Sequence, residues 1–128
     1  MAATREAVSS TMNHVTETAD RILDMAKESK HGRHAELLVH EGPLRQALLA
    51  LTEGTELEEH NSPPAASLYL LQGAVRVTGD GTTDIAAGEL HTLTHRRHSV
   101  TALADSVFLL TTVTSIPGQG SHDTEPVD

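Results

Sequence analysis

Most of this chain consists of short apolar runs separated by turn-forming residues at close intervals, and this pattern constrains the fold more than any other feature. Between the runs stand clusters of glycine, proline, asparagine and aspartate. Many short strands with regular turn signals are typical of an all-β sandwich or barrel, which also removes exposed sheet edges. We therefore predict an all-β jelly-roll barrel with strands at Ala35–His40, Leu44–Leu51, Glu56–His60, Ser67–Leu71, Ala74–Thr78, Thr83–Ala86, Glu89–Leu93, His98–Leu103 and Val107–Val113.

A helical pattern precedes the strands. From Thr4 to Ser29, apolar residues recur at alternating spacings of four and three, which lines one face of a helix. An isolated helix of this length is marginal in water, so we expect it to pack either on its own barrel or on a second copy. Its polar face carries acids as well as bases, which disfavours an anionic membrane surface. The apolar positions are Val8, Met12, Val15, Ala19, Ile22 and Ala26, with Leu23 and Met25 beside them.

The chain ends in a stretch with little to bury. Ser115–Asp128 contains proline, glycine and acidic residues, a composition typical of disorder. The 128 residues leave room for one hydrophobic core. We predict an N-terminal amphipathic helix in residues 1–31, a barrel domain in residues 32–114 and a disordered acidic tail in residues 115–128.

Composition narrows the range of partners. Tyr69 and Phe108 are the only tyrosine and phenylalanine, tryptophan is absent, and the net charge is −9. Few stacking surfaces and a charge that repels polyanions argue against nucleic acid as a partner. The chain has no cysteine, so histidine must carry any metal. No run is long and apolar enough to cross a bilayer, and we expect a cytoplasmic protein without a membrane partner.

The segment from Gly54 to Gly73 contains a glycine, a histidine and a second glycine at defined spacings. Five residues separate Gly54 from His60, and Ser62 and Ala66 follow before Gly73. This segment resembles the first motif of the cupin family, commonly written G-x5-H-x-H-x3-E-x6-G. Both glycines and the first histidine match, whereas Ser62 replaces the second histidine and Ala66 replaces the glutamate.

A second segment, Gly88–Val100, resembles the second cupin motif, G-x5-P-x-G-x2-H, with one residue fewer before the final histidine. His98 takes the place of that histidine. The motif's proline and inner glycine are replaced by Thr94 and by His95 or Arg96.

The wider chain is similar to a group of small bacterial cupins over residues 32–114. The similarity lies in the phrases Gly32–Ala35, Leu44–Leu51 and Arg97–Thr111. This resemblance implies a cupin jelly roll, a homodimer and a pocket, and it implies no particular reaction.

The resemblance also bears on metal binding. Cupin enzymes typically hold Fe, Mn, Ni or Zn with three histidines and one carboxylate. Two of those four ligands, His60 and His98, are retained. Ser62 shares a strand face with His60 but is a poor ligand, and Ala66 supplies no carboxylate to offset the charge of a cation.

Other histidines are candidates for a third ligand. They are His91, His95 and His40. A regular strand places His91 and His95 on one face, and His98 has the opposite parity unless the turn at residues 94–97 resets it. The run His95–His98 is also a basic island that suits an anionic ligand at the barrel mouth, although a solvated hairpin tip shows the same pattern.

Three hypotheses follow from these residues. The leading one is a cupin that binds an unknown small molecule without a complete metal site, and hence without a cofactor. The second is a divergent metal-dependent oxygenase or isomerase that uses His60 and His98. The third is a structural module that dimerises and binds a partner. The sequence leaves open whether the protein is an enzyme. The predicted ligand pocket is lined by His60, Ser62, Tyr69 and His98.

Overall fold

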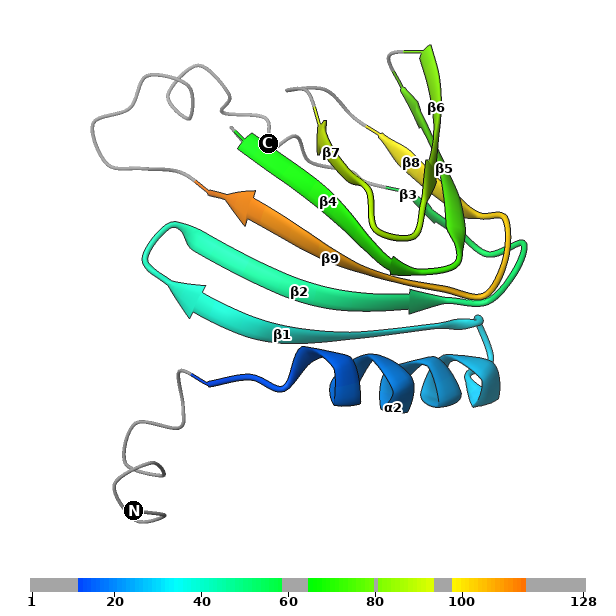
Figure 1. Ribbon diagram of the computed structural model, residues 1–128, viewed down its shortest axis with the longest axis horizontal. Coiled ribbons are helices and arrows are strands. Elements are labelled where there is room, and N and C mark those ends of the chain that lie inside the picture. The colour runs from blue at the N-terminus through cyan, green and yellow to red at the C-terminus, as the bar shows by residue number, and fades with distance from the viewer. Residues whose placement is uncertain (1–11, 59–64, 80, 94–97, 115–128) are drawn as a thin grey trace.

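The computed structural model describes residues 12–58, 65–79, 81–93 and 98–114. One helix and a series of short strands occupy these ranges (Figure 1). The predicted tail, residues 115–128, lies outside them, as do residues 1–11. The elements are α2 (Val15–Glu28), β1 (Arg33–Glu41), β2 (Leu44–Leu51), β3 (Glu56–Glu58), β4 (Ala65–Gln72), β5 (Ala74–Gly79), β6 (Gly81–Ala86), β7 (Leu90–Leu93), β8 (Ser99–Ala102) and β9 (Ser106–Val113).

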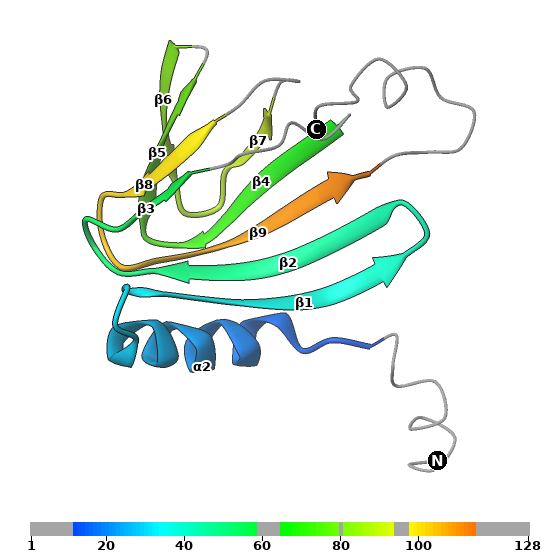
Figure 2. The same cartoon turned by 180° about the vertical axis from the view of Figure 1, so that it is seen from behind.

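The strands form two antiparallel sheets that face each other. A five-stranded sheet has the order β1-β2-β9-β4-β7, and a four-stranded sheet has the order β3-β8-β5-β6. Figures 1 and 2 show the two sheets diverging from a common corner where β4 turns into β5. This is the predicted jelly roll. Each predicted strand is present with slightly different ends, and the last residues of the predicted Glu56–His60 strand lie outside the described ranges.

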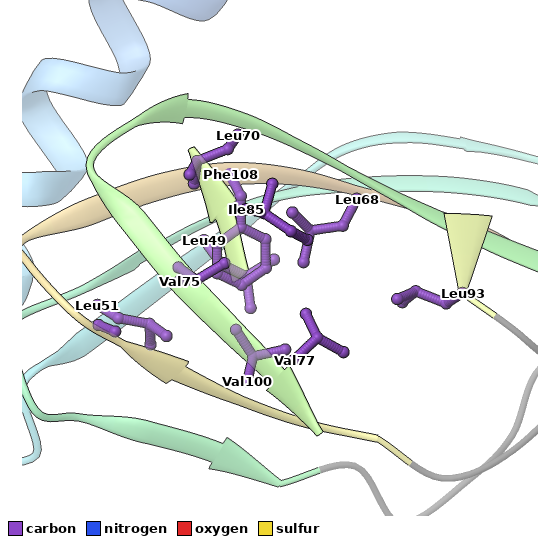
Figure 3. Close-up of a cluster of buried hydrophobic side chains, with 11 residues drawn as sticks. Leu49, Leu51, Leu68, Leu70, Val75, Val77, Ile85, Leu93, Val100 and Phe108 are labelled. Atoms are coloured by element: carbon purple, nitrogen blue, oxygen red, sulfur yellow. The ribbon is translucent and has the colours of Figure 1, made fainter. Parts of the chain in front are cut away.

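The core fills the space between the sheets with aliphatic side chains. Phe108 on β9 is fully buried at its centre and is the one aromatic residue in this cluster. Figure 3 shows side chains from both sheets projecting toward one another. This aliphatic character agrees with a sequence that has one phenylalanine and no tryptophan. Its buried members are Leu49, Leu51, Leu68, Leu70, Val75, Val77, Ile85, Leu93, Val100, Ala102 and Phe108.

Helix α2 covers the outer face of the five-stranded sheet, along β1 and β2 (Figures 1 and 2). Its residues Ala19, Ile22 and Ala26 are fully buried, as the periodicity predicted. They pack with Leu48 and Ala50 of β2, so the helix lies on its own barrel. This result answers one of the questions that the sequence leaves open.

The helix is shorter than predicted at its N-terminal end. It begins at Val15, and the three residues before it are not helical. Asn13 donates a side-chain hydrogen bond to the carbonyl of Leu38 at 3.3 Å, which holds the preceding segment against β1. Met12 is 51% exposed and therefore does not extend the buried stripe.

Two strands of the five-stranded sheet contain a bulge. The register shifts between Leu37 and Val39 in β1, and between Leu70 and Gln72 in β4. The extra residue is a leucine in each strand, and both leucines, Leu38 and Leu71, pack into the cluster beneath α2. The bulges therefore add apolar surface to the face that the helix covers.

Gly73, the last residue of the first motif, occupies a tight corner between β4 and β5. Its φ of 87° lies in the left-handed region, which side chains disfavour. A Cβ at this position would collide with the carbonyl of Asp105 and with Ser106. Both constraints require glycine where the chain passes from one sheet to the other.

No helix in the described ranges is long and apolar enough to span a membrane.

Candidate functional site

The alternation of side chains along β4 defines the inner and outer faces of the five-stranded sheet. Leu68 and Leu70 are fully buried in the core between the sheets, so Ala66 has the same inward direction. Ala66 packs against that core, which places the position of the missing carboxylate on the inner wall. Tyr69 has the opposite parity and is 39% exposed. We expected Tyr69 in the pocket, but it lies on the outer face of β4.

A pocket of about 130 Å³ lies between the two sheets, near the ends of β5 and β7. It is polar for its size, because two imidazoles and three threonines contribute to its wall. His91 projects from β7, and His98 immediately precedes β8. The lining residues are Val77, Thr78, Gly81, Thr83, His91, Thr92 and His98.

Strand register explains why His91 faces this pocket. His91 pairs with Leu68, and paired residues of neighbouring strands point to the same side of a sheet. Because Leu68 is fully buried between the sheets, His91 also faces inward. It is half-buried, which leaves part of the imidazole accessible from the pocket.

His98 reaches the same pocket from the other sheet. Val100 and Ala102 of β8 are buried in the core, and His98 shares their parity. Its exposed fraction is only 8%. His91 and His98 therefore face a common space although they lie an odd number of residues apart. An unbroken strand would place them on opposite faces, whereas β7 and β8 belong to different sheets.

The other predicted site residues are distributed as follows. His60, Ser62 and His95 lie outside the described residues. His40 lies on β1, where the bulge turns it toward the inner face, but it is exposed and does not line the pocket. Of the predicted pocket and metal residues that the structure describes, His91 and His98 are the two that it brings together.

Sequence reasoning did not single out Thr83 of β6 or Arg45 of β2. Thr83 pairs with the core residue Val77, so its side chain faces the pocket. Arg45 pairs with Thr112 on the inner face of the five-stranded sheet. The alternation of side chains along each strand could have revealed both residues. It does so once a buried neighbour shows which positions of the strand face inward.

The described side chains can be compared with the ligands that a metal site needs. The residues that the structure describes contain no group of three histidine, aspartate or glutamate side chains arranged to hold an ion. His91 and His98 supply two imidazoles, and Ala66, at the glutamate position of the motif, supplies no carboxylate. The described residues thus do not by themselves form a complete metal centre.

A second cavity, of about 350 Å³, lies at the opposite seam, where β1 and β3 form the unpaired edges of their sheets. Its wall is mainly apolar and is formed by Arg33, His34, Ala35, Leu49, Leu51 and Leu57. It contains one imidazole and no cluster of polar groups from both sheets, so we regard the pocket with His91 and His98 as the candidate site.

Comparison with known proteins identifies the fold of this chain through solved structures. Neither a protein-family model nor a curated protein matches the chain. Solved structures do match. A conserved protein of unknown function from Streptococcus pyogenes is 24% identical, with 69% of this chain and 79% of that chain covered and a TM-score of 0.61.

Two further solved structures give this fold a name. A cupin superfamily protein from Desulfitobacterium hafniense is 16% identical, with 65% of this chain and 78% of that chain covered and a TM-score of 0.61. A salicylate 1,2-dioxygenase from Pseudaminobacter salicylatoxidans is 19% identical over 76% of this chain and 33% of that longer chain, with a TM-score of 0.65. The chain therefore has the cupin fold, a double-stranded β-helix, and in the described residues helix α2 precedes its strands.

Proposed function

We propose that this protein binds a small molecule between its two sheets and that His91 and His98 take up the polar group of that molecule. The observation that carries this proposal is the convergence of two imidazoles, from different sheets, on one pocket. Neutral imidazole offers one donor and one acceptor, so a pair of them can recognise hydroxyl, amide or acid groups.

The size and lining of the pocket support a role in holding one end of a ligand. A volume of about 130 Å³ corresponds to about four water molecules, which is too small for a whole drug-sized compound. Thr83 and Val77 line the same pocket. A polar head group fits this space, while the rest of the ligand extends toward the barrel mouth.

The experiment is a binding measurement with benzamide, a neutral compound with one polar head group and an apolar body. We expect millimolar benzamide to shift the side-chain NMR signals of His91 and His98, and the variants His91→Gln and His98→Gln to weaken binding. His31→Gln changes an exposed histidine outside the pocket and serves as the control. If acetamide and benzamide leave both signals unchanged up to 50 mM, the proposal is wrong.

Metal-dependent chemistry is the second candidate, and the same pair of imidazoles favours it. A complete site would need a ligand beyond those that the described residues provide, and the sequence offers His60 and His95. Metal content after dialysis distinguishes the candidates. Near-stoichiometric Fe, Mn, Ni or Zn that is lost in His98→Ala and kept in His31→Ala supports a metal site, and its absence from protein loaded with each ion argues against one.

A further inference from the structure

We propose that Arg45 anchors the carboxylate of an organic acid on the inner face of the five-stranded sheet. This inference goes beyond the proposed histidine pocket and adds a second subsite with its class of ligand. Three observations support it: the direction of Arg45, its lack of a partner among the described residues, and the side chains that lie beside it.

The direction of Arg45 follows from its neighbours on β2 and β9. The amide of Gln46 donates a hydrogen bond to the hydroxyl of Thr111 at 3.1 Å, and both residues lie on the outer face with Leu48. Arg45 and Thr112, one residue away on each strand, therefore point inward. Thr112 pairs with Ala66, which packs against the core between the sheets.

The charge of Arg45 has no protein partner within the described ranges. Arg21 donates two hydrogen bonds to Glu36, and Arg76 donates two to Asp84, on the outer surface. Arg45 is half-buried, and no hydrogen bond or ion pair is formed by its guanidinium with any described residue. A partly desolvated cation without a counter-charge favours an anion from solution.

The neighbours of Arg45 strengthen this preference. His40 pairs directly with Arg45 across β1 and β2, so a second basic side chain lies on the same face. Ala66, two strands away in the same row, supplies no carboxylate. The imidazole of His40 can donate a hydrogen bond to an anion held by Arg45.

A row of apolar residues lies beside Arg45 on the inner face of the sheet. It contains Ala47, Leu110 and Leu68, each paired to the next across the sheet. Leu68 is fully buried in the core, whereas Ala47 and Leu110 are only half-buried. A ligand held by Arg45 therefore contacts Ala47 and Leu110.

This arrangement selects the class of ligand. The planar fork of one guanidinium matches a planar carboxylate through two parallel hydrogen bonds. The half-buried side chains of Ala47 and Leu110 beside it suit an aromatic or aliphatic body. The ligand is therefore an organic acid with an apolar body.

Benzoate and benzamide test this inference because they differ in charge and share their shape. We expect wild-type protein to bind benzoate about tenfold more tightly than benzamide, since charge-assisted hydrogen bonds are roughly twice as strong as neutral ones. Arg45→Gln should abolish this selectivity, and Arg45→Lys should retain part of it. Arg33→Gln removes a cation from the other end of β1 and should change nothing.

An internal carboxylate gives a second and independent test. Ala66→Glu places an acid on the inner wall in the row of Arg45, where it should compete with benzoate and weaken its binding. Ala65→Glu places the same charge on the exposed outer face of β4 and is the matched control. Circular dichroism checks that both variants fold, and if Ala66→Glu does not fold, Arg45→Gln alone decides the outcome.

The outcomes separate this inference from the proposed function. If benzoate and benzamide bind equally, or if Arg45→Gln leaves the selectivity unchanged, Arg45 is not the anchor although the histidine pocket still binds ligand. If neither compound binds up to 50 mM, the carboxylate assignment is wrong together with the pocket.

Discussion

The guanidinium of Arg21 donates hydrogen bonds of 2.7 and 2.9 Å to the two carboxylate oxygens of Glu36. Arg21 lies on α2 and Glu36 on β1, so this fork fixes the rotation of the helix on the sheet. The imidazole of His34 lies 3.4 Å from the same carboxylate. The hydrogen bond from Arg21 is the largest cause that lowers the pKa of Glu36 below its ordinary value.

This pair predicts a pH dependence of stability. Because the folded-state pKa of Glu36 is lowered, its contribution is complete above the carboxyl's ordinary pKa and is lost as pH falls through the folded value. Glu36→Gln should therefore be slightly less stable than wild type at pH 7, and the difference should vanish in acid. Urea unfolding at pH 7, 5 and 3 measures it. A difference that grows toward pH 3 would contradict the assignment.

Replacement of Ile22 by alanine tests how strongly α2 is docked. Ile22 is fully buried between the helix and the sheet, so its truncation should leave a cavity and cost about 2–5 kcal/mol of unfolding free energy. Met25→Ala, on the same helix but 40% exposed, should cost much less. Chemical denaturation of both variants gives the comparison, and equal losses would show that the helix packs less tightly than described.

Gly73→Ala separates backbone strain from steric collision. Gly73 and Gly88 have nearly the same φ, 87° and 90°, so alanine is strained to a similar degree at both. Of these two glycines, only Gly73 would place a Cβ against neighbouring atoms, those of Asp105 and Ser106. We expect Gly88→Ala to cost about 1 kcal/mol and Gly73→Ala clearly more. Thermal unfolding of the two variants measures the difference, which should favour Gly88→Ala.

The hydroxyl of Ser106 should contribute to stability at the same corner. Ser106 is fully buried, and its oxygen accepts a hydrogen bond from the amide of Ala74 at 3.0 Å and donates to the carbonyl of Ala104 at 2.7 Å. Ser106→Ala leaves those groups without a partner and should cost about 1–3 kcal/mol. Ser67→Ala removes a half-buried hydroxyl that makes no hydrogen bond in the described part of the structure, and it should be nearly neutral.

The sequence predicted the strands because each is bounded by residues that turn the chain. Glycines at positions 54, 73 and 88 have positive φ, which is the reason that they mark the strand ends. The apolar stripe of α2 was predicted for a similar reason, since its period matches a helix. These features depend on neighbours in sequence, and local patterns are sufficient to reveal them.

The site was harder to predict because it depends on parity between distant strands. A bulge moves the residues that follow it to the opposite face of the strand. The residues around Leu38 and Leu71 give no sequence signal for a bulge. Tyr69 was placed in the pocket without such a register and lies on the opposite face. Arg45 was overlooked because its inward direction becomes visible only through its pairing with Thr112.

The bulge in β1 also changes which residues of this strand face the other sheet. Arg33 and His40 are separated by an odd number of positions, so an unbroken strand would present them to opposite sides. The surplus residue brings both onto the side that faces the other sheet, as their partners Leu51 and Arg45 show. Deletion of Leu38 would leave this orientation intact and remove only a contact with the helix. The length of β1, as much as its composition, therefore decides which basic side chains face the other sheet.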